Sequence, residues 1–304
     1  MSTIFSGALY HTLKKTLRNI VTDKTDGLEE GLVLKRFMDE GTMDDQYVDD
    51  LEVGGVPLAS EKAEGAELST GTLREGTLSR YNSRTFGLKM IITREAMEDV
   101  KYDQAVKLQR RLKRALYKTA DIDATNVLVR AFNSSYVGGD GVSLGSASHT
   151  VPGGTTFSNI MATPLSPSTA ALVIATSQLM KMPDHSGLVS GIMPKKIVCP
   201  VDQWATWAIL TKSSGAPAAG EFNAINVVKT ELDITEVVKN KYWSNTTTNW
   251  ALITDAENGL NFLWRRKPSG DDWVDNDQQV SKFSQSARWA RGWSDARGIY
   301  LVNA

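Results

Sequence analysis

Hydrophobic and polar residues alternate over residues 81–92, YNSRTFGLKMII. The apolar positions recur at every second residue and are Phe86, Leu88, Met90 and Ile92. This spacing is the period of a half-buried strand, so residues 81–92 are predicted to form one. Thr93 is an acceptable helix N-cap, and carboxylates follow in the first two turns, where the helix dipole favours them. These carboxylates are Glu95, Glu98 and Asp99.

Residues 93–132 contain neither proline nor glycine and predict a very long helix. An interruption at residues 100–103 fits the pattern, in which case Asp103 would cap a second helix. One arc of the helix is apolar: Ala105, Leu108, Leu112, Ala115 and Leu116. The opposite arc is basic: Lys107, Arg110, Arg111, Arg114 and Lys118. We expect the apolar arc to lie on a sheet and this second arc, the basic stripe, to face outward.

The basic stripe has two interpretations. The ordinary one is a solvated helix surface. However, residues 104–120 contain six bases and no acid, whereas a surface helix usually mixes signs and gains from pairs four residues apart. The composition therefore favours a face turned toward a polyanion.

A polar stretch precedes the predicted strand. Residues 39–52 carry seven acids and no base, and residues 53–80 are rich in Gly, Glu, Ser and Thr and lack aromatic residues. Such a stretch buries too little apolar surface to offset chain entropy. It is either a flexible linker or an extended hairpin that becomes ordered only against a neighbouring subunit. Alternation over residues 67–73, with Gly71 near a turn, favours the hairpin.

The rest of the chain predicts a mixed domain of about 100 residues, inserted after the long helix. A Gly/Ser-rich connection over residues 133–166 leads to a helix with Pro167 at its first position, ending near Met182. Further elements are a strand at 193–201, a helix at 202–212, a loop at 213–221, strands at 227–238, 250–254 and 260–264, and alternating segments over 279–303. All eight tryptophans lie after residue 200. The densest core is therefore expected in the C-terminal third.

Composition narrows the class of protein. The chain has 304 residues, 41% of them hydrophobic and 23% charged, which suits a globular protein of one large or two ordinary domains. No signal peptide is apparent, and no apolar run approaches the roughly 18 residues of a membrane span. We therefore expect a protein that stays in the cytoplasm in which it is made and has no membrane partner.

Candidate catalytic and metal-binding residues are few. Cys199, the single cysteine, lies in an apolar run and is expected to be buried and inert. The three histidines, His11, His149 and His185, are too scattered in sequence for a metal site. The acids of residues 271–277 lack the Gly and Glu of a calcium loop and are interpreted as a turn. No catalytic or nucleotide-binding motif occurs, so neither an enzyme nor a cofactor is expected.

The order of elements and two short passages resemble a known family. FGLKMIITREAMEDVKYD (86–103) and FSQSARWARGWSDARGIYL (283–301) are similar to passages of the major capsid proteins of tailed bacteriophages. The resemblance implies an α+β fold of the Hong Kong 97 type. It divides the chain into an N-terminal arm (1–48), an extended β-hairpin loop (49–85), a peripheral domain with its spine helix (86–166), an axial domain (167–265) and the return strands of the peripheral domain (266–304).

The resemblance also implies a function. The chain would self-assemble, as hexamers and pentamers, into the icosahedral head around the double-stranded DNA of a tailed phage. It would be assembled in the host cytoplasm with a portal, a separate scaffolding protein, which Met1 favours, and in some phages a decoration protein. The basic stripe would contact packaged DNA without reading its sequence. The extended loop would contact a neighbouring subunit through Glu61, Lys62, Glu64, Glu67, Leu73 and Arg74.

Two alternatives remain. The first is a nanocompartment shell of the encapsulin type, which keeps the fold but encloses cargo protein in place of DNA. The second is a two-domain cytoplasmic enzyme or ligand-binding protein, which would form a small discrete oligomer.

Overall fold

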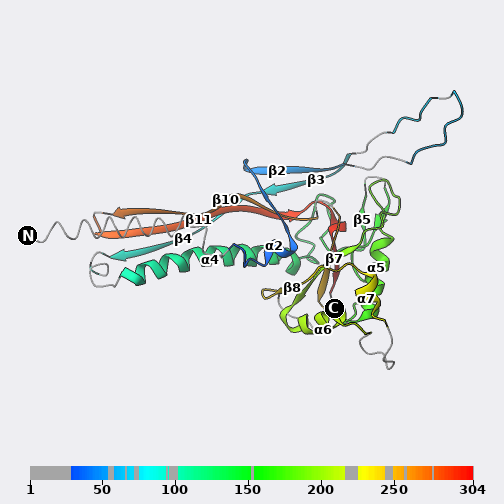
Figure 1. The fold of residues 1–304 in the computed structure, drawn as a ribbon. Coiled ribbons are helices and arrows are strands. Elements are labelled where there is room, and N and C mark those ends of the chain that lie inside the picture. Colours follow the sequence, from blue (N-terminus) through cyan, green and yellow to red (C-terminus); the bar gives the residue numbers. More distant parts are fainter. Residues whose placement is uncertain are drawn as a thin grey trace, which may run out of the picture.

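The computed structural model shows two packed bodies and a hairpin that projects from them (Figure 1). It describes residues 29–53, 58–65, 67–71, 75–93, 95, 102–151, 154–215, 225–243, 249–256, 259–275 and 277–303.

The first body is a four-stranded sheet in the order β1-β10-β11-β4, with the long helix α4 along one face (Figure 1). The strands are β1 (Asp39–Thr42), β4 (Arg84–Thr93), β10 (Leu260–Asp275) and β11 (Val280–Trp293). Strand β1 runs parallel to β10, and the other pairs are antiparallel. Strand β4 forms within the predicted 81–92 segment but begins at Arg84, because Tyr81 and Asn82 end β3; Phe86, Met90 and Ile92 are partly buried as predicted, whereas Leu88 is 43% exposed. Its Phe86 stacks on Trp289 of β11 with ring centroids 4.1 Å apart.

Helix α4 spans Tyr102–Val129: it begins within the interruption allowed at residues 100–103 and ends three residues before the predicted 132. Thr93 is the last residue of β4, and residues 94 and 96–101, on which its predicted role as a cap depends, lie outside the described residues. The predicted carboxylates Glu98 and Asp99 lie outside the described residues. At 1.5 Å per residue the 28-residue helix is about 42 Å long. On its inner side, Leu116 is buried, as the apolar arc predicts.

The second body is a four-stranded sheet in the order β12-β9-β7-β8. Its strands are β7 (Pro194–Pro200), β8 (Glu236–Asn240), β9 (Trp250–Thr254) and β12 (Ile299–Val302). Its helices are α5 (Thr169–Met180), the single turn η2 (Val201–Gln203), α6 (Trp204–Lys212) and α7 (Val227–Glu231). Helix α5 begins two residues later than predicted, because the Ser168 side chain accepts a hydrogen bond from the amide of Ala171 and caps it there.

Two predictions about strands were wrong. The apolar pair at the start of 227–238 begins helix α7, because Asn226 caps it through the amide of Val228, and the strand forms only at Glu236–Asn240. The expected division at residue 265 falls inside β10, and β12 pairs with β9 of the second sheet. Residues 299–302 therefore do not return to the first sheet. Pairing between distant strands, which periodicity does not report, decides the second point.

The second sheet is apolar on both faces and joins two cores. Val198, Ile299 and Leu301 face a core shared with α4 and the first sheet. The alternate residues Cys199 and Tyr300 face a second core under α5, α6 and α7. Tryptophans fill both cores, as the sequence predicts: Trp264 and Trp289 in the first, Trp207 and Trp250 in the second.

Two of the connections between the bodies cross each other in close contact. Gly259 precedes β10, and Gly298 closes η3 (Ala296–Gly298) before β12. A Cβ built on Gly298 would lie 2.3 Å from the Cα of Gly259, and one on Gly259 would lie 2.9 Å from the Cα of Gly298. Only glycine fits at either position, because backbone meets backbone there.

The acidic segment forms a hairpin, as the favoured interpretation predicts, but it is ordered within its own chain, which corrects the expectation that only a neighbouring subunit orders it. Strand β2 (Tyr47–Val53) pairs antiparallel with β3 (Glu75–Asn82), and α2 (Leu34–Phe37) packs against α4. Leu34 and Phe37 are buried, and the carboxylate of Asp121 on α4 accepts a hydrogen bond from the amide of Leu34 at 3.0 Å. Residues 29–48 are thus part of the folded body, whereas residues 1–28 lie outside the described residues.

The Gly/Ser-rich connection forms irregular turns and one short hairpin, as predicted. Strand β5 (His149–Thr150) pairs with β6 (Thr156–Phe157). His149 is 1% exposed; its Nδ1 lies 2.5 Å from the carboxylate of Asp140 and its Nε2 lies 3.1 Å from the carbonyl of Leu144. The contacts of His149 with Asp140 and Leu144 therefore hold this part of the connection together.

Candidate assembly surfaces

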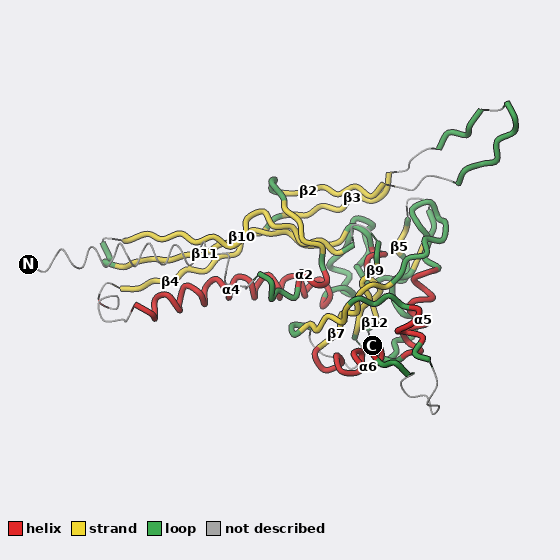
Figure 2. The backbone as a smooth tube through the Cα atoms, viewed as in Figure 1, coloured by secondary structure: helices red, strands yellow, loops and turns green. Residues whose placement is uncertain are grey.

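The outer part of the hairpin, here called the hairpin tip (residues 58–65 and 67–71), lies beyond the paired strands and away from both bodies (Figure 2). Every one of its residues is exposed. The two sides meet through a hydrogen bond between the hydroxyls of Ser60 and Ser69 at 2.8 Å, and Gly65 turns the chain with φ +78°. The alternation at 67–71 produces no strand, because the described ladder ends at Val53 and Glu75.

The hairpin tip combines acids with two apolar side chains. The predicted contact residues Glu61, Lys62, Glu64 and Glu67 are exposed. Leu58 and Leu68 are 76% and 78% exposed. Leu73 and Arg74 lie outside the described residues. A projecting segment that presents large apolar side chains on both sides of a turn is typical of a surface that another molecule covers.

The inner end of the hairpin is fixed by an apolar contact. Tyr81 of β3 is 3% exposed and packs with Met43 and Ala290. The Ser294 hydroxyl donates to the carboxylate of Asp50 at 2.5 Å and also contacts the hydroxyl of Tyr81. Burial raises the pKa of Tyr81, which keeps its phenol neutral.

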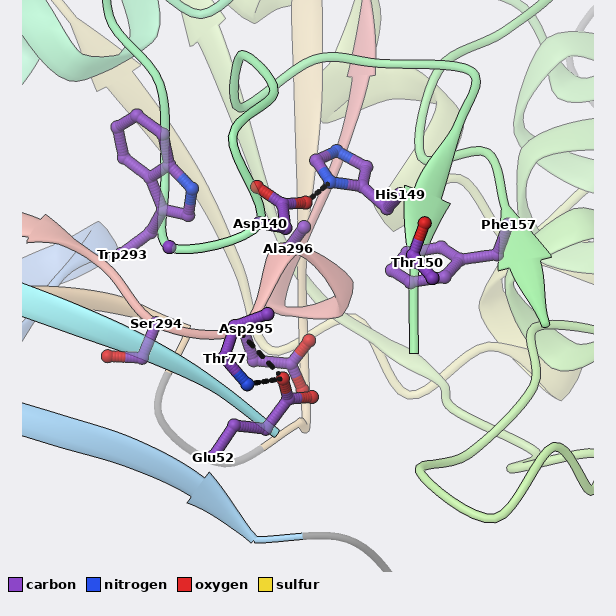
Figure 3. A pocket seen from close by; sticks show the side chains of 11 residues that line it. Glu52, Thr77, Asp140, His149, Thr150, Phe157, Trp293, Ser294, Asp295 and Ala296 are labelled. Atoms are coloured by element: carbon purple, nitrogen blue, oxygen red, sulfur yellow. Dashed lines mark hydrogen bonds and ion pairs between the residues drawn. The ribbon is translucent and has the colours of Figure 1, made fainter. Parts of the chain in front are cut away.

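The outer end of the paired strands meets a small pocket between the bodies (Figure 3). Glu52 of β2 lies in it and accepts hydrogen bonds from the amide and the hydroxyl of Thr77. Nδ1 of His185 lies 2.6 Å from the Glu52 carboxylate, and the Arg297 guanidinium lies 3.4 Å from it. Asp295 is bound by the same guanidinium at 2.7 Å. This cluster joins residues far apart in the sequence, and no motif or spacing indicates it.

The basic stripe is brought together as predicted. Arg110, Arg111, Arg114 and Lys118 are exposed on α4, and the side chain of Lys107 lies outside the described residues. The two acids of α4 whose side chains are described point inward: Asp123 contacts Arg291 at 2.7 Å, and Asp121 is buried. Within the described part of the chain, none of the four cations lies within ion-pair distance of a carboxylate.

Cys199 is fully buried in the second core, and burial raises the pKa of its thiol to about 12. At pH 8 the thiol is therefore protonated and inaccessible. We expect iodoacetamide to leave Cys199 unmodified in the folded protein and to modify it fully in guanidinium chloride, as measured by intact mass. Modification at similar rates in both states would contradict the burial.

The remaining candidates for chemistry are arranged as ordinary structural features. Among the described residues no group of His, Cys, Asp and Glu side chains could hold a metal ion, and no helix there could span a membrane. The acids near the β10–β11 turn are solvated or paired; Asp275 accepts from the amides of Asp277 and Gln278 and binds Lys282 at 2.7 Å.

Comparison with known proteins identifies the family. The sequence matches the model of the phage capsid protein family over residues 77–302, well over half of the chain. No curated protein matches it. The match begins within β3 and includes both sheets and α4. The chain therefore belongs to the phage capsid protein family.

Solved structures agree with this family. The structure is similar to one from Microbacterium phage Oxtober96, with a TM-score of 0.57 at 9% identity, covering 90% of this chain and 91% of that one. It is similar to the capsid of Cyanophage P-SCSP1u, with a TM-score of 0.56 at 12% identity, covering 89% and 87%. A virus-like particle from Pyrococcus furiosus gives 0.51 at 10% identity, covering 95% and 98%. At such identities the likeness shows a shared fold.

The protein is thus a major capsid protein, with the α+β fold of phage capsids, and it forms the icosahedral shell of a tailed-phage head. Its family and fold define a structural protein that associates with copies of itself in the virion.

Proposed function

We propose that the hairpin tip is the arm by which one subunit binds the next in the shell. The exposure of Leu58 and Leu68 at the end of a projecting segment is the observation that carries the proposal. Burial of two leucines contributes about 1.5 kcal/mol each at least. Glu61, Glu64 and Glu67 add charge that would select a basic or hydrogen-bond-donating surface on the neighbour.

A shell needs contacts that are weak enough to correct and numerous enough to hold. One hairpin contact of this size is modest, and it recurs in every subunit. Exposed apolar residues of the second body, such as Ile209 on α6 and Val173 on α5, provide a further surface for contacts around the centres of hexamers and pentamers. Cross-linking tests the arm directly: a reagent that joins a thiol to a lysine amine should link Leu68→Cys to a neighbouring subunit within particles, and the link starts only at position 68 because Cys199 is buried. An absence of adducts in intact particles would contradict the arm.

The basic stripe is proposed to face the interior and screen packaged double-stranded DNA. Four exposed cations without carboxylate partners in the described part of the chain repeat with every subunit. Such contacts bind phosphate without reading bases, and each lost cation lowers the salt slope of binding by about 0.9.

A variant with Gln at the four described positions of the basic stripe should therefore package a lower mass of DNA per particle and bind DNA more weakly, in a salt-dependent way. These positions are Arg110, Arg111, Arg114 and Lys118. The matched control replaces four lysines of the second body by Gln, because it removes the same charge from there. These are Lys181, Lys195, Lys212 and Lys229. Both variants should keep the unfolding midpoint of the parent, since surface changes cost within about 0.5 kcal/mol. Normal DNA density in the stripe variant would contradict an inward-facing stripe.

The fold is also shared with a virus-like particle from Pyrococcus furiosus. Particle contents test the head directly: a phage head should contain DNA and carry attached tails, and an enclosed enzyme in place of DNA would contradict it. A portal, a separate scaffolding protein and decoration proteins are expected partners of the head, as is assembly in the host cytoplasm. Co-purification from infected cells tests each of them.

A further inference from the structure

Charged side chains from separate parts of the chain meet where the hairpin leaves the body. Glu52 is in β2, His185 follows α5, and Arg297 is in η3. We propose that these three residues, here called the latch, hold the outer end of the β2–β3 stem against the second body at neutral pH and release it on acidification. The proposal concerns the subunit itself and does not require the assembly proposed above.

The geometry of the latch is that of a shared carboxylate. His185 and Arg297 both approach Oε1 of Glu52, at 2.6 Å and 3.4 Å, while Thr77 donates to Oε2 from its hydroxyl at 3.0 Å. The side chain of Arg297 is 3% exposed, and it also donates to Asp295 and to the carbonyl of Pro183. The cationic side of the latch is thus fixed to the second body, and Glu52 is the group that the hairpin contributes. Figure 3 shows Glu52 with its hydrogen bond to Thr77.

The stem is attached at two separate places, so losing one does not detach it. The inner attachment is the apolar contact of Tyr81 with Met43 and Ala290. The outer attachment is the latch. Release of the latch would free the ends of β2 and β3 near Val53 and Glu75 while Tyr81 stays packed. The hairpin would then pivot about Tyr81, and a small rotation there would move the hairpin tip a long way.

The charged groups around Glu52 indicate which proton matters. Asp295 is bound by Arg297, and Asp184, beside His185, accepts from the amides of Ser186 and Leu188. Across the pocket, His149 and Asp140 contact each other at 2.5 Å. Each of these acids therefore has its own partner. Glu52 is the acid that bridges the hairpin and the second body.

The sign of the pH effect follows from Glu52. Burial by itself raises its pKa, but the hydrogen bonds from His185 and Thr77 and the nearby positive charges outweigh burial and lower the pKa below its ordinary value. Because the pKa of Glu52 is lower in the folded state than in the unfolded state, its ionised carboxylate stabilises the contact at pH values above the unfolded pKa, about 4.3. That stabilisation is lost as pH falls through the folded value, so release belongs to the range below about pH 4.3.

Hydrogen–deuterium exchange of the full chain tests the latch. At pH 7, Glu52→Gln should increase exchange of the amides of residues 50–53 and 75–78 about tenfold, because a hydrogen bond to a charged group is lost. The parent protein should show the same increase when acidified below about pH 4.3, after correction for intrinsic rates. Amides of Tyr81 and of β9 should keep their protection in both cases.

Asp49→Asn is the matched control. Asp49 lies in the same strand, but its partner is Arg80 within the hairpin, at 2.6 Å. This variant should change exchange less than twofold at pH 7 and should keep the acid response of the parent. Wild-type protection in Glu52→Gln would overturn the latch, as would a parent hairpin that does not respond to acid. Loss of protection over the whole chain would also overturn it, because that indicates global unfolding.

Discussion

Trp289→Ala is expected to lower the free energy of unfolding by about 3–5 kcal/mol, the range for removing a large aromatic side chain from a core. Trp289 is 1% exposed and stacks on Phe86. It also contacts Phe262 and Trp264 with centroids 6.1 Å and 5.5 Å away. The substitution would leave a cavity between β4, β10, β11 and α4 and would remove the hydrogen bond of the indole N–H to Asp123. Urea unfolding followed by circular dichroism measures the loss.

Trp273→Ala is the control for this prediction. Trp273 belongs to β10, which pairs with β11, and its side chain is 43% exposed. Its loss should cost less than about 1 kcal/mol, since little apolar surface is buried there. Equal losses in the two variants would show that the aromatic cluster of the first body does not hold it together.

Removal of the hairpin tip is expected to abolish particle formation and to leave the subunit folded. A short Gly-Ser linker in place of residues 58–71 would preserve the β2–β3 pairing, because the ladder lies outside the replaced segment. A finer change, Leu58→Ser with Leu68→Ser, should weaken each contact by about 3 kcal/mol, roughly a hundredfold in the association constant. Light scattering and negative-stain microscopy would then show subunits or small oligomers in place of megadalton particles.

Leu78→Ser provides the matched control, since Leu78 lies in the stem of the same hairpin and is 50% exposed. It should assemble as the parent does. Normal particles from the double leucine variant would instead place the contacts between subunits entirely on other surfaces.

Local pattern predicted the elements whose identity depends on their own residues. The alternation of Phe86, Leu88 and Met90 gave β4, and the absence of glycine and proline gave α4. The tryptophan distribution indicated the cores. The basic stripe was also visible, because a helix turns sequence spacing into a face.

Features that depend on distant partners could not be predicted. The acidic segment looked unable to fold, yet β10 pairs with its first strand, Lys35 and Lys267 lie beside Glu40, and Arg80 binds Asp49. Strand β12 joins a sheet whose other members lie far earlier in the chain. The latch joins Glu52 to Arg297 across 245 residues of sequence. None of these contacts leaves a periodic trace in the sequence.

The crossing of Gly259 and Gly298 has a mechanical consequence for a closed shell. Positions in an icosahedral lattice differ in local curvature, so identical chains must bend slightly to fill all of them. Two connections between the bodies touch backbone to backbone at this waist, so no side chain at the contact resists a small change of angle, and the shared core around Val198, Ile299 and Leu301 has to absorb it. Alanine at Gly298 would wedge the waist open and fix one angle, so the chain would fit flat facets and curved vertices unequally.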